Sequence, residues 1–378
     1  MKIRYLTFAN ISNNGSLLQA VALQEHLRRM YPEHDIGTLS YTVPSALTRE
    51  ALKQIHLHYE NPLFNFRRYR LFKEFVRDSL DWDYTVRSFL SYHRVAQVMN
   101  GMGCDMFVVG SDVWALNSDA HRPGFPNPYW ISETVKSRKV AFGVSAYNSN
   151  PRRFTRNAEK LRSILSGFEF VGAREEETYR LLEPYTPPGK LHRSYDAAFF
   201  YEYRPTNLRE KLKMNRIDIG RPILLVLFPN SHPRLRFYIE KMRQRGFQVI
   251  GTGLYNRDVD VNLGAVLDPF EWAEMFKLAS ISVSMLLHGT IFAMMAGTPF
   301  VALDVGVGKE HSKKWQMLVE FGLSGLYFDL SGPEGGEALV RKHDEVVGTW
   351  TGTYSPLVRE AVSIASCRNG ELLGTIIG

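Results

Sequence analysis

Residues 281–303, ISVSMLLHGTIFAMMAGTPFVAL, constrain the fold more than any other stretch of this chain. An apolar strand is predicted over 281–286, followed by a short polar turn that contains His288. An apolar helix follows and ends at Gly297, and Pro299 leads into a second strand over 300–303, because glycine and then proline are typical helix stop signals. A strand, a helix and a strand in this order form the repeating unit of a parallel α/β sheet.

The same alternation of strands and helices runs through both halves of the chain. Further strands are predicted at 2–8, 35–41, 106–109, 139–145, 168–172, 222–228 and 247–251, with helices between most of them. The pattern predicts an α/β protein with two Rossmann-like domains facing a cleft, a GT-B-like arrangement. We expect an N-terminal domain over 1–203 with a helical insertion at about 44–102, a C-terminal domain over 204–348, and a segment over 349–378 that crosses back to the first domain.

Composition narrows the choice of partners. The chain has 378 residues, enough to bury two cores, and carries 46 basic against 39 acidic residues, a net charge of +7. This excess favours anionic partners such as phosphorylated metabolites. The basic residues are spread out, so nucleic acid is not expected, and two cysteines provide neither a disulfide framework nor a zinc site.

Localisation follows from hydropathy. No apolar run reaches the ~20 residues of a membrane-spanning helix, and the N-terminus lacks the pattern of a signal peptide. We therefore expect a cytoplasmic protein. The basic amphipathic segment FRRYRLFKEFVRDSL, residues 66–80, has two open interpretations: a peripheral contact with the inner face of a membrane, or a helical layer packed on a sheet.

Polar residues that follow apolar strands are the candidate site residues, because ligands of open α/β sheets bind at the carboxyl ends of strands. They are Asn14, Gly15 and Gln19 after the first strand, Ser111 and Asp112 after 106–109, Ser145 after 139–145, and His288, Gly289 and Thr290 after 281–286. Arg174 opens a helix, where a cation is unfavourable unless an anion joins it. HExxH, CxxC, GxSxG and GxxxxGK[ST] patterns do not occur in the sequence, and no metal is expected.

Several separated stretches together resemble the polysaccharide pyruvyl transferase family. NNGSLLQAVAL at 13–23 is similar to the family's N-Y-G-x-x-L-Q-A-x-A-L, and FVVGSD at 107–112, followed by Trp114, resembles F-I-V-G-S-D-Q-V-W. Ala141 to Ser145, Arg174-Glu175 and Asp196 with Ala198 resemble further family stretches, and LHGTIF with Pro299-Phe300 resembles H-G-T-I-F…P-F-V. One departure is Leu286, where some members carry an arginine that is thought to hold the donor.

The resemblance implies transfer of pyruvate from phosphoenolpyruvate to two hydroxyls of a sugar, forming a ketal, with no other cofactor. It implies His288 as the acid/base group. Arg174, Gly289, Thr290, Lys309 and Lys313 would hold the donor, with a lysine such as Lys309, Lys313 or Lys314 in place of the missing arginine. Asn14, Gly15, Gln19, Ser111, Asp112 and Ser145 would contact the acceptor, a sugar that is lipid-linked or free.

Three alternatives remain open from the sequence. His288 could be a core histidine bonded to a backbone carbonyl, and Asn14 and Gln19 could serve only to cap a loop. The chain could instead be a GT-B-like glycosyltransferase that uses a nucleotide sugar, since the same fold serves both chemistries. It could also be a member of a polysaccharide pathway without catalytic activity. The sequence leaves the oligomeric state undefined.

Overall fold

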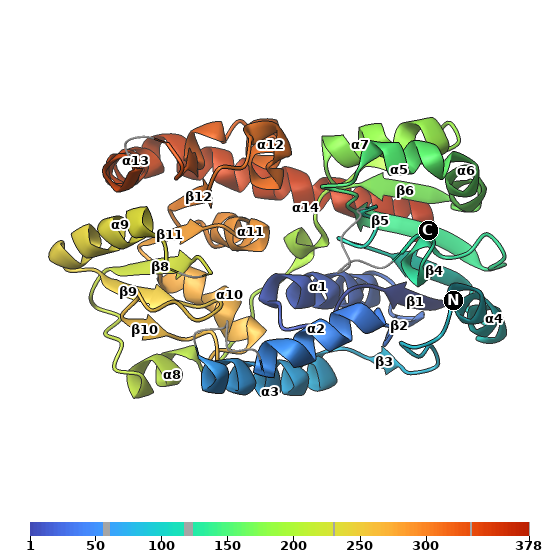
Figure 1. Cartoon of the computed structure of the whole chain (residues 1–378), viewed down its shortest axis with the longest axis horizontal. Helices are drawn as coiled ribbons and strands as arrows, with labels where there is room; N and C mark the ends of the chain where they lie inside the picture. The colour runs from blue at the N-terminus through green and yellow to red at the C-terminus, as the bar shows by residue number, and fades with distance from the viewer. Residues whose placement is uncertain (56–60, 117–123, 230, 333–334, 378) are drawn as a thin grey trace. The chain divides into compact units, whose positions relative to one another are not determined.

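The computed structural model describes residues 1–55, 61–116, 124–229, 231–332 and 335–377. Over these residues the chain forms two compact units (Figure 1). The first comprises Met1–Leu52, Lys73–Tyr201 and Ala365–Gly378, and the second comprises Lys53–Phe72 and Glu202–Ile364. The prediction of two Rossmann-like domains is confirmed by a parallel sheet in each unit, while the cleft remains a prediction.

The first unit contains a sheet whose described strands follow the order β3-β2-β1-β4-β5-β6-β7, every neighbouring pair being parallel. Its strands are β1 (Lys2–Leu6), β2 (Asp35–Leu39), β3 (Trp82–Asp83), β4 (Met106–Val109), β5 (Arg138–Val144), β6 (Phe170–Ala173) and β7 (Leu191–Arg193). Its helices are α1 (Asn14–Met30), α4 (Tyr92–Gly101), α5 (Pro151–Arg156), α6 (Ala158–Ser166) and α7 (Glu176–Leu182), with short 3-10 turns at Pro128–Trp130, Glu183–Tyr185 and Ala197–Phe200.

The second unit contains a sheet of described strands in the order β10-β9-β8-β11-β12-β13, again parallel throughout. Its strands are β8 (Ile223–Leu227), β9 (Gln248–Gly251), β10 (Val261–Asn262), β11 (Ile281–Ser284), β12 (Phe300–Asp304) and β13 (Tyr327–Asp329). Its helices are α8 (Leu208–Met214), α9 (Pro233–Gln244), α10 (Pro269–Leu278), α11 (Leu287–Ala296), α12 (Lys313–Glu320) and α13 (Gly335–Thr349), with 3-10 turns at Lys309–His311 and Ser324–Leu326 and a π-helical turn at Trp350–Tyr354.

Three helices contribute residues to both units: α2 (Pro44–Ile55), α3 (Pro62–Ser79) and α14 (Ser355–Ile377). The segment at 44–102, expected to be a helical insertion, contains the short strand β3 as well as helices. Residues 53–72 of this segment belong to the second unit. No helix among the described residues is long and apolar enough to cross a membrane.

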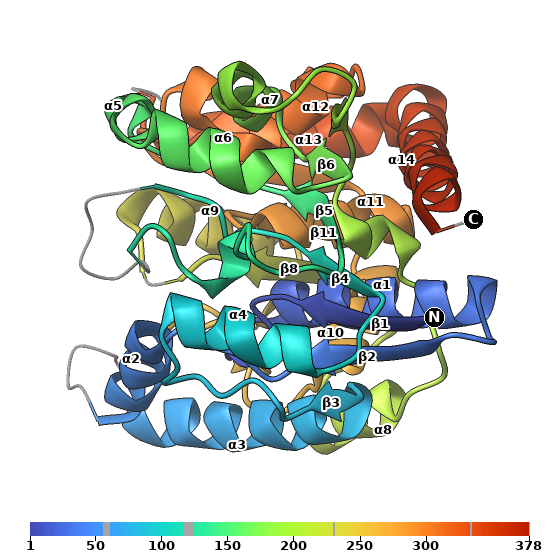
Figure 2. The same ribbon diagram turned by 90° about the vertical axis from the view of Figure 1, so that its right-hand side faces the viewer.

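The central strands are buried along their whole length, as in β4 (MFVV) and β8 (ILLVL). Continuous apolar strands are typical of parallel sheets covered by helices on both faces, and Figures 1 and 2 show such helices in each unit. Helix ends follow the sequence signals: Asn13 caps α1, Asp268 and Glu271 form a capping box at α10, and Gly297 ends α11 with a φ of 68°.

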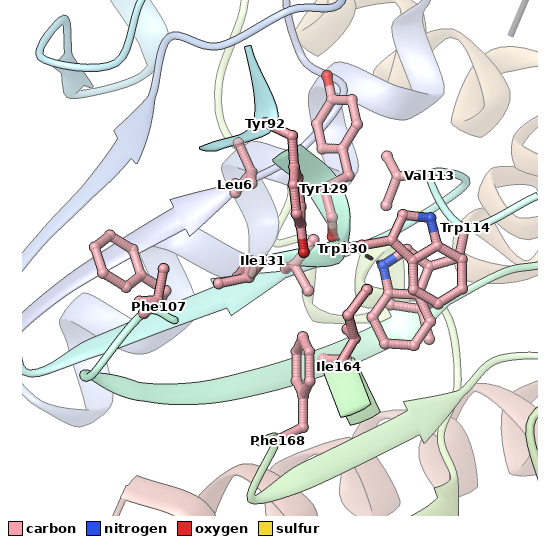
Figure 3. Close-up of a cluster of buried hydrophobic side chains, with 14 of the residues drawn as sticks. Leu6, Tyr92, Phe107, Val113, Trp114, Tyr129, Trp130, Ile131, Ile164 and Phe168 are labelled. Atoms are coloured by element: carbon pink, nitrogen blue, oxygen red, sulfur yellow. Dashed lines mark hydrogen bonds between the residues drawn. The ribbon is translucent and has the colours of Figure 1, made fainter. Parts of the chain in front are cut away.

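An aromatic cluster fills one side of the first sheet (Figure 3). The rings of Trp114 and Trp130 stack with their centroids 4.4 Å apart, and the Trp114 indole N–H donates to the carbonyl of Tyr129 at 2.9 Å. Val113 packs in the same cluster. Because Val113 and Trp114 directly follow Ser111 and Asp112, the cluster fixes the loop that carries these two site candidates.

A buried histidine of α13, His343, packs against α9 in the second unit. The Tyr238 hydroxyl and His343 Nδ1 are 2.8 Å apart, and burial lowers the pKa of His343 to about 4 despite the nearby carboxylate of Asp344. The native state therefore holds this histidine neutral, whereas in the unfolded chain it protonates near its ordinary pKa of about 6.5.

We predict a loss of stability in mild acid from this residue. Its contribution to the free energy of unfolding is complete above pH ~6.5 and falls, by an amount on the order of 3 kcal/mol, as the pH drops from about 6.5 to 4. Urea denaturation across this range measures the loss. The His343→Gln variant, which keeps a hydrogen-bonding group but does not titrate, should lose most of this pH dependence, and the exposed His93→Gln should keep it. An equal slope in His343→Gln and wild type contradicts the assignment.

Candidate functional site

Both sheets place polar side chains at their topological switch points. In the first unit the chain runs from β1 outward to β2 and β3, then returns to the other side of β1 for β4 and the strands beyond. In the second unit it runs from β8 to β9 and β10, then returns beside β8 for β11. The loops after β1 and β4, and those after β8 and β11, therefore diverge, and ligands of open α/β sheets bind where loops diverge in this way.

Arg174, which follows β6, reaches the first switch point through Asp112, which follows β4. It lies at the centre of an ionic cluster that we call the Arg174 cluster: Arg174, Asp112, Glu175 and Asp196. Nε donates to Glu175 at 2.7 Å, one terminal nitrogen to Asp196 at 2.8 Å and the other to Asp112 at 2.5 Å. The guanidinium is 4% exposed, whereas the Asp112 side chain is 47% exposed. Burial would lower the pKa of Arg174, but the three carboxylates raise it above its ordinary range.

Backbone hydrogen bonds join the cluster to neighbouring strands. The N–H of Arg174 donates to the Val144 carbonyl at 2.9 Å, and the N–H of Ser145 donates to the Ser111 carbonyl at 2.8 Å. The Thr178 hydroxyl donates to Glu175 and accepts from the N–H of Ala146. The structure thus brings four sequence-predicted residues together: Ser111, Asp112, Ser145 and Arg174. Of these residues, Ser111 and Ser145 are buried, whereas the carboxylate of Asp112 is exposed.

The remaining first-unit candidates lie at the start of α1, directly after β1. Asn14 and Gln19 are buried, at 6% and 1% exposure, and Gly15 is buried with them. Among the described residues, the side-chain nitrogen and oxygen of Gln19 have no hydrogen-bond partner. The side-chain carbonyl oxygen of Asn14 also has none. A buried amide without hydrogen-bond partners lowers the free energy of unfolding by about 1–3 kcal/mol. Packing alone therefore does not explain why a glutamine occupies this buried position.

At the second switch point, α11 begins earlier than the sequence suggested. Strand β11 ends at Ser284, and the helix begins at Leu287, so His288 lies in the first helical turn and is half-buried. The Ser284 side chain closes the turn, since its Oγ accepts from the N–H of Leu286 and its hydroxyl donates to the Leu286 carbonyl, both at 3.0 Å.

Because α11 begins at Leu287, the N–H of Thr290 already takes part in an intrahelical hydrogen bond. The Thr290 N–H donates to the Leu286 carbonyl at 3.1 Å, as does the Thr290 hydroxyl at 3.4 Å. The Thr290 N–H is therefore bonded within the helix, and the assignment of Thr290 to the donor stays a prediction. Gly289 lies in the first turn, where helical N–H groups have no acceptor four residues earlier in the same helix, so it stays a candidate.

Gly289 also allows α11 to approach the sheet closely. A Cβ at this position would overlap Ser284 Oγ and lie 3.1 Å from Leu227 Cδ2, on the neighbouring strand β8. Only a residue without a side chain fits between the helix and both strands.

We predict that Gly289→Ala lowers the free energy of unfolding by about 1–3 kcal/mol, because overpacking forces the helix start away from β8 and β11. Thermal or urea denaturation measures the change. Gly348→Ala is the matched control in the same unit: nothing lies within 4 Å of its Cβ position, so alanine there should be neutral or stabilising. Equal stabilities of Gly289→Ala and wild type would contradict the close approach.

The three lysines considered for the missing arginine differ in position. Lys309 is exposed, with Nζ 4.4 Å from the centre of the Trp315 ring, and Lys313 is half-buried. Lys314 is buried, and its Nζ donates to Asp304 Oδ1 and to the Met285 carbonyl, both at 2.7 Å. Burial lowers the pKa of Lys314, and Asp304 offsets part of that effect. Lys314 therefore holds the backbone at Met285, the residue directly before Leu286.

Sequence reasoning missed Asp304, Ser312 and Ser284. Asp304 ends β12 and accepts from Lys314 and from the Ser312 hydroxyl. The rule that selected Asp112, a polar residue at the carboxyl end of an apolar strand, applies equally to Asp304. Among the residues that the structure describes, no group of three or more His, Cys, Asp or Glu side chains could hold a metal ion.

Solved structures with the same fold place this chain in the GT-B class, which has two parallel-sheet α/β domains. A glycosyltransferase from Rickettsia africae aligns with a TM-score of 0.58 at 13% identity, covering 99% of this chain and 97% of that one. A putative UDP-N-acetylglucosamine 2-epimerase from Listeria monocytogenes also reaches 0.58, at 10% identity, covering 99% and 95%. The UDP-GlcNAc 2-epimerase from Neisseria meningitidis, bound to UDP-GlcNAc, reaches 0.53 at 11%, covering 99% and 100%.

The sequence itself is more specific than the fold. The family model for polysaccharide pyruvyl transferase matches residues 13–306, which is most of the chain and includes both switch points. No curated protein matches the sequence. The chain belongs to the polysaccharide pyruvyl transferase family.

Proposed function

We propose that this protein transfers pyruvate from phosphoenolpyruvate to two hydroxyls of a sugar in a polysaccharide or glycolipid precursor and forms a pyruvate ketal. The observation that carries the proposal is the family match across both switch points, together with His288 in the first turn of α11 at one of them. Membership of the family supports a role in modifying polysaccharide, and ketal formation from phosphoenolpyruvate is the specific reaction that we assign.

The reaction requires proton transfers in both directions. Protonation of the methylene carbon makes C2 electrophilic, and one sugar hydroxyl attacks C2 while losing its proton. Phosphate leaves as its bond to C2 breaks, and the second hydroxyl then adds to C2 and loses its proton. One proton ends on the new methyl group and the other leaves with phosphate. Histidine titrates near neutral pH, so we assign proton transfer to His288.

The donor carries a phosphate and a carboxylate, which favour cations and helix N-termini. We assign it to the start of α11 at Gly289 and Thr290, where the helix dipole also favours an anion. Lys309 and Lys313 follow β12 in the same unit and supply charge in place of an arginine at Leu286. Arg174 keeps its predicted role at the donor, but it would have to bind while paired with three carboxylates.

The acceptor is assigned to the first switch point. The Gln19 amide and the Asn14 carbonyl oxygen, buried without described hydrogen-bond partners, suit the hydroxyls of a sugar. Asp112, exposed at the edge of the Arg174 cluster, supplies a further acceptor for a hydroxyl proton. Gly15, Ser111 and Ser145 complete the assigned set as backbone and loop contacts.

The test is release of phosphate from phosphoenolpyruvate in the presence of a panel of nucleotide-linked and lipid-linked sugars, with the new ketal methyl group followed by NMR. Phosphate release that depends on one class of sugar, with the methyl signal, is the expected result. A thermal-shift comparison complements it, because a ligand that binds the native state raises the melting temperature. Stabilisation by nucleotide sugars but not by phosphoenolpyruvate would instead indicate a glycosyltransferase, and a response to neither would indicate a non-catalytic member.

A further inference from the structure

The peptide group between Met285 and Leu286 is hydrogen-bonded on both of its edges. Its carbonyl accepts from Lys314 Nζ at 2.7 Å, and its N–H donates to Ser284 Oγ at 3.0 Å. The N–H of Met285 also donates to the carbonyl of Leu227 in β8, at 3.1 Å. Because a peptide group is planar, hydrogen bonds on both edges fix the backbone torsions on either side of it. This peptide joins β11 to α11, so its orientation sets the direction in which the helix leaves the sheet.

Lys314 makes this contact from a buried ion pair. Lys314 is 7% exposed and Asp304 is 5% exposed, and Lys314 Nζ donates to Asp304 Oδ1 at 2.7 Å. The Ser312 hydroxyl donates to the other oxygen of Asp304 at 2.5 Å, and Ser312 Oγ accepts from the N–H of Trp315 at the start of α12. The ammonium is thus charge-compensated and almost closed to solvent. It is better suited to hold a backbone carbonyl than to receive an anionic substrate.

We propose that Lys314 is a positioning residue for the reaction. By holding the Met285 carbonyl it fixes the start of α11, and therefore the imidazole of His288, three residues further on. The inference rests on the proposed function, because the proton transfers that Lys314 serves are those assigned to His288. A general acid or base must lie within hydrogen-bond reach of its target, and a displacement of about 1 Å can cost about 10²-fold in rate. Lys314 thus acts on turnover through the backbone, whereas Lys309 and Lys313 act on the donor by charge.

Two variants loosen this peptide from opposite edges. Lys314→Met combined with Asp304→Asn removes the ammonium and keeps the pair neutral with little change of volume. Lys314→Met alone would leave a buried carboxylate without its cation, which is strongly destabilising. Ser284→Ala removes the hydrogen bond on the N–H edge with no change of charge. Lys241→Met is the matched control, because it removes an exposed lysine from α9 in the same unit.

Steady-state release of phosphate from phosphoenolpyruvate separates positioning from donor binding. Both loosened variants should lower kcat about 10²-fold, a larger change than that in KM for phosphoenolpyruvate, because proton transfer depends steeply on position. Lys313→Met, which removes a cation assigned to the donor, should instead raise this KM with kcat retained. Lys241→Met should leave both constants at their wild-type values.

Amide hydrogen exchange in the full chain tests the anchoring of α11 without the reaction. Exchange over residues 287–296 should be about 10-fold faster in both loosened variants, as expected when one hydrogen bond that holds the helix start is lost. Strands β8 and β9 should keep their wild-type protection. A general loss of stability would instead speed exchange in all of these elements together and would contradict a local role.

Three further outcomes overturn the proposal. Unchanged exchange over 287–296 in both variants would show that Lys314 does not anchor α11. Faster exchange with wild-type turnover would remove its link to the reaction. A raised KM with kcat retained in the Lys314→Met and Asp304→Asn variant would make Lys314 a donor contact. If the wild-type protein releases no phosphate with any sugar while exchange over 287–296 depends on Lys314, the proposed reaction fails and the anchoring of α11 stands.

Discussion

Replacing His288 by alanine is expected to lower the rate of phosphate release from phosphoenolpyruvate by about 10²–10⁴-fold, the usual contribution of a general acid or base. The side chain is half-buried in the first turn of α11, so its removal should leave the helix and the sheet intact. Steady-state turnover with a saturating acceptor measures the effect, and urea denaturation establishes that the variant remains folded.

The pH profile distinguishes proton transfer from simple positioning by His288. If His288 moves protons, the wild-type profile contains a limb that the alanine variant lacks. His93→Ala is the control, since His93 is exposed on α4, outside the loops that form the switch points, and should leave turnover unchanged. Turnover of His288→Ala within two-fold of wild type would assign the proton transfers to another group.

The second large effect is expected at Arg174. Arg174→Met removes the cation from between three carboxylates, two of which, Glu175 and Asp196, are buried. Breaking a buried ion pair by removing one partner typically costs about 3–5 kcal/mol, because the remaining charges are left without compensation. At about 2–4 °C for each kcal/mol, the melting temperature of the first unit should fall by roughly 6–20 °C.

Two further variants define the origin of this loss. Arg174→Met combined with Asp112→Asn removes one of the repelling carboxylates and should recover part of the stability. Arg180→Met is the matched control on α7: its ion pair with Glu176 is exposed, so the change should stay below about 1 kcal/mol. A stable Arg174→Met variant that no longer binds phosphoenolpyruvate would instead show that the arginine serves the donor alone.

The sequence predicted the interior of the fold better than its edges. The central strands appear within one or two residues of their predicted positions, because they are continuous apolar runs. The four described strands that were not predicted, β3, β7, β10 and β13, are the edges of the two sheets and have two or three residues each. Such strands carry no periodicity, and edge strands do not need an apolar run to pair.

The candidate residues were chosen by their place after strands, and the structure explains why their partners were harder to predict. Arg174 pairs with Asp112, 62 residues earlier, and Asp196, 22 residues later, contacts that only the order of strands in the sheet brings together. The start of α11 was misplaced because Ser284 closes the turn with its side chain, an interaction that hydropathy does not report. The roles of the site residues remain predictions.

The end of α14 has a consequence for the order in which the protein can fold. The buried side chain of Asn369 accepts from the N–H of Tyr195 and donates to the carbonyls of Tyr195 and Asp196. Asp196 is itself a partner of Arg174, yet it is translated 173 residues before Asn369. While the ribosome is still making the second unit, the first therefore lacks the hydrogen bonds that hold this loop. Synthesis must pass through the end of the second unit before the loop that carries Asp196 gains these hydrogen bonds.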